Sequence, residues 1–243
     1  VVCIQECERM NTLLQTIRFS LNELDAGLKG QLNITDAMEG LANALSLNRV
    51  HDSWEKYAYF SKKALTDWYA DLLMRINQLQ EWSTDLITPK SLWISGLFNP
   101  MSFLTAIMQV TAREKMLPLD DMCLKTDVLN TKDTEELPGP AESGAYVHGF
   151  FLEGAGWECG RGGEQGYLTD MILKELHPEL PVMHVTSIRL SERMKAGHYE
   201  CPVYVTSMRG PTYIFTANLK MESEESDPNK WILAGVALLQ SPE

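Results

Sequence analysis

The feature that most constrains the fold is a change in hydrophobic spacing near residue 116. Before this point, apolar residues recur at three- and four-residue steps, which places them on one face of a helix. The pattern is strongest over residues 65–82, and it also runs along residues 10–28, 38–45 and 101–111. The first half of the chain is therefore predicted to be helical.

Residues near the ends of these segments predict where the helices start and stop. Thr35 and Ser61 are expected to cap the second and third patterns, because a side-chain oxygen at this position accepts a hydrogen bond from a free backbone amide. Asn99-Pro100 predicts another helix start, since proline in the first turn lacks an amide that would be unpaired anyway. Gly30 fits the end of the first helix.

After residue 116 the pattern becomes short strands separated by turn signals. The expected strands are 122–128, 146–152, 182–188, 203–208, 213–219 and 231–239, with Arg209–Pro211 at hairpin distance between two of them. Only residues 168–176 are expected to add a helical turn. Strands joined without crossover helices form antiparallel sheets, and closing such a sheet removes its edges. The predicted fold is α+β: a helical subdomain over residues 1–116, then a small antiparallel six-stranded β-barrel over residues 117–243.

Composition narrows the classes of partner. The formal net charge of −12 disfavours a nucleic-acid binder, which needs a basic surface, and disfavours adhesion to an anionic membrane. No apolar run approaches the roughly 18 residues that span a bilayer. The five cysteines are an odd number without clustered spacing, which predicts reduced thiols and a cytosolic compartment.

The glycine-rich run from Phe150 to Gly166 is the nearest approach to a nucleotide-binding motif. Cys159 stands where the third glycine of a G-x-G-x-x-G fingerprint should follow Gly154 and Gly156, and no G-K-[ST] occurs in the sequence. The segment downstream is also a poor helix, so nothing would present a helix N-terminus to a phosphate. The run is therefore interpreted as the turn between two strands.

No other motif predicts chemistry. His148 and His184 lie in predicted strands, so a metal or ligand site inside a barrel is an alternative, but a hydrogen-bonded or outward-facing role is favoured for both. Cys3 and Cys7 lack partners for zinc, and no G-x-S-x-G appears. The sequence predicts no catalytic, cofactor-binding or metal-binding residue and no cofactor.

Several long segments of the sequence resemble the C-terminal region of dynein heavy chains, in the same order. They are SLWISGLFNPMSFLTAIMQVTARE (91–114), LPLDDMCL (117–124), GAYVHGFFLEGAGWE (144–158), LPVMHVTSI (180–188), YECPVYVTSMRGPTYIFTANLKM (199–221) and WILAGVALLQ (231–240). The segment 97–114 is most similar to axonemal heavy chains of the outer-arm type. Residues 72–82 match more loosely.

The resemblance implies long helices followed by a small six-stranded barrel, packed beneath a ring of AAA+ modules in the same heavy chain. It implies a non-catalytic domain that modulates ATP-driven, microtubule-based motility of cilia and flagella, located in the cytoplasm and cytoskeleton at the axoneme. ATP hydrolysis and microtubule binding would lie elsewhere in the heavy chain. The AAA+ modules are the implied partners, and other axonemal dynein subunits are further candidates; no nucleic acid or membrane is implied.

Two alternatives stay open at this point. One is a small-ligand-binding or enzymatic barrel with His148 and His184 facing its cavity, although barrels of few strands are normally filled by side chains. The other is docking of a neighbouring axonemal component on the acidic loops at residues 135–136 and 222–230, because a negative surface steers a basic partner.

Overall fold

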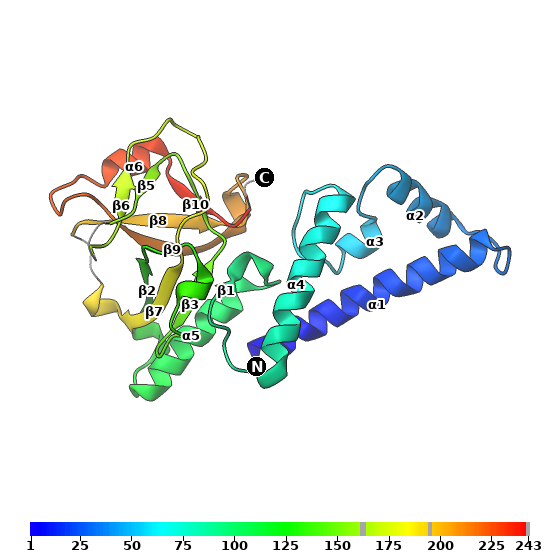
Figure 1. Ribbon diagram of the computed structural model, residues 1–243, viewed down its shortest axis with the longest axis horizontal. Helices are drawn as coiled ribbons and strands as arrows, with labels where there is room; N and C mark the ends of the chain where they lie inside the picture. The colour runs from blue at the N-terminus through cyan, green and yellow to red at the C-terminus, as the bar shows by residue number, and fades with distance from the viewer. Residues whose placement is uncertain (161–163, 194–195, 242–243) are drawn as a thin grey trace. The chain divides into compact units, whose positions relative to one another are not determined.

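The computed structural model describes residues 1–160, 164–193 and 196–241. These residues form two compact units. The helical unit comprises Val1–Ile87 with Gly96–Phe98, and the strand-rich unit comprises Thr88–Ser95 with Asn99–Glu243. The backbone therefore leaves the helical unit, contributes a short segment to the strand-rich unit, and returns for three residues before α5 begins. Figure 1 shows the elements of each unit.

The helical unit consists of α1 (Val2–Leu28), α2 (Asp36–Ser46), α3 (Asp52–Glu55) and α4 (Leu65–Asp85). The long helix α1 packs against the other three. Aromatic side chains fill the space between them: the ring of Trp68 stacks on Trp54 and on Tyr59, with centroids 6.2 and 5.8 Å apart. The Trp54 indole N–H donates to the Ser20 hydroxyl at 2.9 Å, which ties α3 to α1.

The helical periodicity predicted the buried face in part. Leu13, Trp68 and Leu79 are buried. Leu28, Tyr69 and Leu73, at the margins of the predicted faces, are exposed.

Two of the predicted caps are confirmed. The Thr35 hydroxyl accepts a hydrogen bond from the Met38 amide at the start of α2. At the start of α5 (Pro100–Glu114), the Asn99 side-chain oxygen accepts one from the Ser102 amide, with proline in the first turn. The end of the first helix is also as expected, because Gly30 follows the C-cap residue with φ +72°.

The predicted Ser61 cap of α4 is wrong. The N-cap residue is Ala64, whose methyl group cannot accept a hydrogen bond, and the Ser61 hydroxyl instead accepts from the Lys63 amide. The Asn48 side-chain oxygen accepts from the Thr66 amide at 3.0 Å, 18 residues away in sequence. A cap supplied from another segment leaves no local signal in the sequence around the helix start.

The strand-rich unit contains ten strands among its described residues. They are β1 (Leu92–Trp93), β2 (Met122–Val128), β3 (Ala145–His148), β4 (Phe151–Glu153), β5 (Gly156–Glu158), β6 (Tyr167–Thr169), β7 (Met183–Arg189), β8 (His198–Tyr204), β9 (Tyr213–Lys220) and β10 (Ala237–Leu239). They form two four-stranded sheets, ordered β1-β3-β7-β2 and β4-β10-β8-β9, and the two-stranded sheet β5-β6.

The expected α+β class is confirmed, with helices first and sheets after, but the closed six-stranded antiparallel barrel is not what the described residues form. Two strand pairs are parallel, β1 with β3 and β10 with β8. Parallel pairing needs a long connection between the strands, and both pairs join segments more than 30 residues apart. The predicted barrel paired each strand with its neighbour in sequence. It therefore did not include β1, which pairs with β3, and it did not predict that β10 pairs with β8.

The bounds of individual strands agree with the prediction in some places and differ in others. β2 has the predicted bounds, whereas the predicted strand 146–152 is two strands of different sheets, broken at Gly149. The predicted strand 231–239 is the short helix α6 (Asn229–Ala234) followed by β10, because Gly235 in the left-handed region ends the helix. Residues 168–176 form strand β6 and a turn instead of a helix, and β8 begins earlier than expected and ends at Tyr204.

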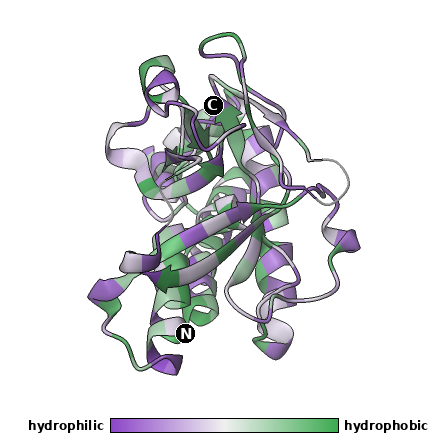
Figure 2. Cartoon of the chain, turned by 90° about the vertical axis from the view of Figure 1, so that its left-hand side faces the viewer, coloured by the Kyte–Doolittle hydropathy of each residue, from purple (hydrophilic) through white to green (hydrophobic). Residues whose placement is uncertain are grey.

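The core of the strand-rich unit lies on the inward faces of the two larger sheets. Alternate residues of β7 from Met183 to Ser187 and of β8 from Tyr199 to Val203 are buried. Figure 2 shows hydrophobic and hydrophilic residues interspersed along the strands. Phe150, which connects β3 to β4, meets the edge of the Phe215 ring of β9. Helix α5 packs against β2, β7 and β9 through its buried apolar side chains, among them Phe103, Leu104 and Ile107.

Candidate functional site

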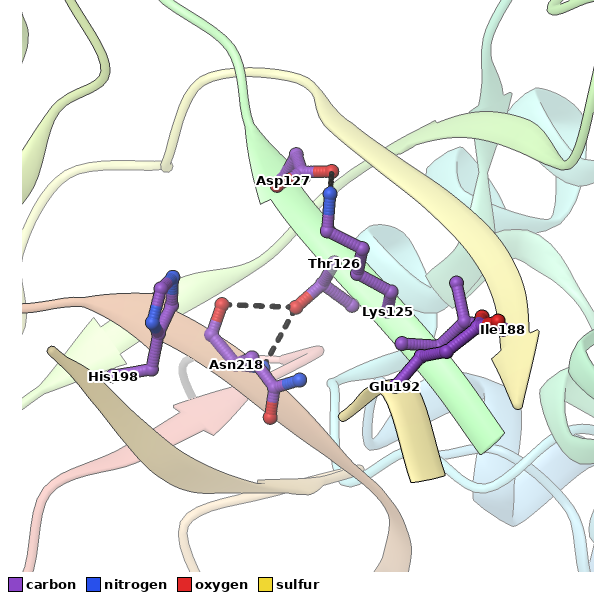
Figure 3. Close-up of a pocket in the computed structure, with 7 residues that line it drawn as sticks. All are labelled: Lys125, Thr126, Asp127, Ile188, Glu192, His198 and Asn218. Carbon is purple, nitrogen blue, oxygen red and sulfur yellow. Dashed lines mark hydrogen bonds and ion pairs between the residues drawn. The ribbon is translucent and has the colours of Figure 1, made fainter. Parts of the chain in front are cut away.

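The edges of the two larger sheets meet at β2 and β9, where the side chain of Thr126 bridges the two strands. The Thr126 hydroxyl oxygen accepts a hydrogen bond from the Asn218 amide at 2.7 Å and donates to the Asn218 carbonyl oxygen at 3.1 Å. Figure 3 shows this hydroxyl between the strands, aimed at the Asn218 backbone. The hydroxyl thus occupies the position that a paired backbone would take in a continuous sheet. We call this junction the Thr126 seam.

A cleft of about 230 Å³ lies beside the Thr126 seam. Its lining comes from the four strands β2, β7, β8 and β9 and from a 3-10 turn: Lys125, Thr126, Asp127, Ile188, Glu192, His198 and Asn218. The ammonium of Lys125 is 2.7 Å from the Asp127 carboxylate, so these two charges largely neutralise each other. The side-chain oxygen of Asn218 is buried and has no hydrogen-bond partner among the described residues. The cleft can hold small polar groups, but its described lining contains no nucleophile-and-base arrangement.

The two histidines of the sequence prediction do not meet in a cavity. The His148 ring lies 2.9 Å from the Ser91 hydroxyl, and the His184 ring lies 2.8 Å from the Ser143 carbonyl oxygen and against Tyr146. Both side chains occupy the half-exposed face of their sheet, while their neighbours in sequence are buried. Burial lowers the pKa of His148, which favours the neutral ring. In the described part of the protein, no three His, Cys, Asp or Glu side chains are grouped to hold a metal ion.

The glycine-rich run forms a strand and part of a hairpin, as interpreted from the sequence. Strand β5 pairs with β6 in antiparallel fashion, Trp157 opposite Leu168. A Cβ atom on Gly166 would lie 2.6 Å from the Trp157 indole nitrogen, so glycine is required for close packing on this ring. The part of the run at residues 161–163 lies outside the described residues. The element that follows is a strand and not a helix, so the helix N-terminus that a phosphate loop needs does not follow this run.

All five cysteines lie in the described part of the protein, and all are free thiols. Burial raises the pKa of Cys3 to about 11, with a further contribution from neighbouring Cys7. Burial also raises the pKa of Cys123 and of the fully enclosed Cys201. A nucleophilic cysteine requires a lowered pKa, whereas the pKa of each of these three thiols is raised.

A buried charged cluster in the helical unit was not predicted from the sequence. Glu6, Asp71 and Arg75 are 1, 8 and 5% exposed. The Arg75 guanidinium lies over the Tyr59 ring, 3.5 Å from its centroid, and the Lys63 ammonium is 2.9 Å from the Asp71 carboxylate. Burial lowers the pKa of Arg75, while Tyr59, Asp71 and Glu6 favour its charged form. Several segments of one unit therefore converge on these charges.

The same cluster holds the segment that returns from the strand-rich unit. The Glu6 carboxylate accepts a hydrogen bond from the Phe98 amide at 2.5 Å, and the Phe98 ring meets Tyr59 edge to face. A signal for this cluster exists in the sequence: Asp71 and Arg75 stand four residues apart on the same helix face as Trp68, Leu72 and Leu79. Charged residues at apolar positions of a helix indicate a buried ion pair.

We expect Thr126→Val to lower the free energy of unfolding of the strand-rich unit by about 2–3 kcal/mol, because valine keeps the shape but leaves a buried amide and a buried carbonyl of Asn218 unpaired. Urea unfolding measures this loss. The matched control is Thr216→Val on β9, whose exposed hydroxyl contacts the Tyr213 hydroxyl and should cost less than about 0.5 kcal/mol. Equal losses in the two variants would contradict a structural role for the seam.

Comparison with known proteins identifies the family. Residues 1–240 match the family described as the C-terminal domain of the dynein heavy chain. The protein belongs to this family. The resemblance inferred from the segments between residues 91 and 240 is therefore confirmed.

Related proteins agree along nearly the whole sequence. The ciliary dynein beta chain of Heliocidaris crassispina is 50% identical over 239 residues, and dynein axonemal heavy chain 9 of Homo sapiens is 48% identical over the same length. The flagellar outer-arm dynein beta chain of Chlamydomonas reinhardtii is 44% identical over 238 residues. Each alignment covers 98% of the present sequence and 5% of the relative, so the protein spans about a twentieth of the length of these heavy chains. None of the described helices is both long and apolar enough to cross a membrane.

Proposed function

We propose that this protein is the non-catalytic C-terminal domain of an axonemal dynein heavy chain of the outer-arm type. The observation that carries the proposal is 44–50% identity, over 98% of the sequence, to beta chains named ciliary or flagellar outer arm. Its location would be the axoneme of a cilium or flagellum. ATP hydrolysis and microtubule binding are assigned to other parts of the heavy chain. The cleft beside the Thr126 seam, with its neutralised charge pair, supports a structural rather than a catalytic role.

The proposed partners are the AAA+ modules of the same heavy chain. A domain that contacts several modules, with different contacts in each nucleotide state, biases their equilibrium by the difference in contact free energy. A coupling of about 1–3 kcal/mol changes a rate or a population by about five- to hundredfold. In this way a non-catalytic domain modulates an ATP-driven motor.

The assignment of residues 1–116 and 117–243 to two subdomains also stays a prediction. We propose that residues 1–116 form a helical subdomain that continues from the AAA+ ring and that residues 117–243 form a second, strand-rich subdomain. The long uninterrupted α1 and the charged cluster around Arg75 support the first part. The two larger sheets support the second, because all of their strands except β1 come after residue 116.

Removing residues 1–243 from the intact heavy chain tests the proposal. We expect microtubule-stimulated ATPase, gliding velocity or stall force to change by about fivefold or more in at least one measurement. The Lys29→Ala variant of the heavy chain, a change in an exposed ion pair, serves as the control and should behave as the parent. If all three properties of the truncated motor match those of the intact motor, the proposed modulation is wrong.

A further inference from the structure

We draw no further inference here: the strongest candidate, the cleft beside the Thr126 seam with the buried side-chain oxygen of Asn218 in its lining, belongs to the site already described, and its lining, in which Lys125 and Asp127 neutralise each other, favours no single class of ligand.

Discussion

Replacing Arg75 with methionine is expected to lower the free energy of unfolding of the helical unit by about 3–5 kcal/mol, because it removes a buried cation that faces the buried carboxylates of Glu6 and Asp71. Glu6 and Asp71 are 1 and 8% exposed, so water cannot take over the role of the guanidinium. The substitution also removes the cation from the face of the Tyr59 ring. Urea unfolding followed by tryptophan fluorescence measures the loss, since Trp54 and Trp68 lie beside the cluster.

An exposed ion pair in the same unit provides the control for Arg75. Lys29 and Asp25 are four residues apart at the end of α1 with both side chains 61% exposed, and Lys29→Ala should cost less than about 0.5 kcal/mol. A loss in Arg75→Met no larger than that in Lys29→Ala would show that the buried cluster does not stabilise the unit. Because Glu6 accepts the Phe98 amide, we also expect the Gly96–Phe98 segment to become more accessible to hydrogen exchange in Arg75→Met.

Replacing Gly149 with alanine is expected to lower the free energy of unfolding of the strand-rich unit by about 2–5 kcal/mol. Gly149 has φ +93°, a conformation that costs an L-residue roughly 1–2 kcal/mol. An added Cβ would also lie 2.5 Å from Cδ1 of the Trp93 ring, and such overpacking costs about 1–3 kcal/mol more. The position is critical because the backbone passes here from the sheet of β3 to the sheet of β4.

Gly210 separates the two contributions at Gly149. It also has positive φ, +58°, but a Cβ there would meet no described atom within 4 Å. Gly210→Ala should therefore show only the backbone strain, about 1–2 kcal/mol, in the same urea experiment. Equal destabilisation by the two substitutions would mean that the Trp93 contact adjusts without cost.

Much of the fold could be predicted where the determining contacts are local. The helical spacing of residues 65–82 predicted α4, the Asn99-Pro100 pair predicted the start of α5, and alternation predicted the bounds of β2. The interpretation of the glycine run as a turn also followed from local requirements, since the glycine spacing, the missing G-K-[ST] and the poor downstream helix all disfavoured a phosphate loop. A helix end or a buried strand face depends on residues a few positions apart, which a single sequence displays directly.

The wrong predictions for residues 231–239 and for Ser61 have other causes. Residues 231–239 have apolar character that suits a strand, yet Gly235 in the left-handed region divides them into α6 and β10. Ser61 has a good capping side chain, yet Asn48 serves the Thr66 amide instead. Gly235 lies inside its segment and ends the helix as a left-handed C-cap residue, which the apolar pattern does not include. At Ser61 a residue from another segment decides the outcome.

By itself, the sequence determined that helices come first and strands follow, and that the protein belongs to the family of dynein C-terminal domains, because both depend on patterns that lie along the chain. Only the tertiary structure decided which strands share a sheet, how Thr126 joins β2 to Asn218 across 92 positions, and how Glu6 and Arg75 meet inside the helical unit. The physical reason is that pairing and ion-pair burial are set by the free energy of the whole packed unit, in which distant segments compete for the same partners.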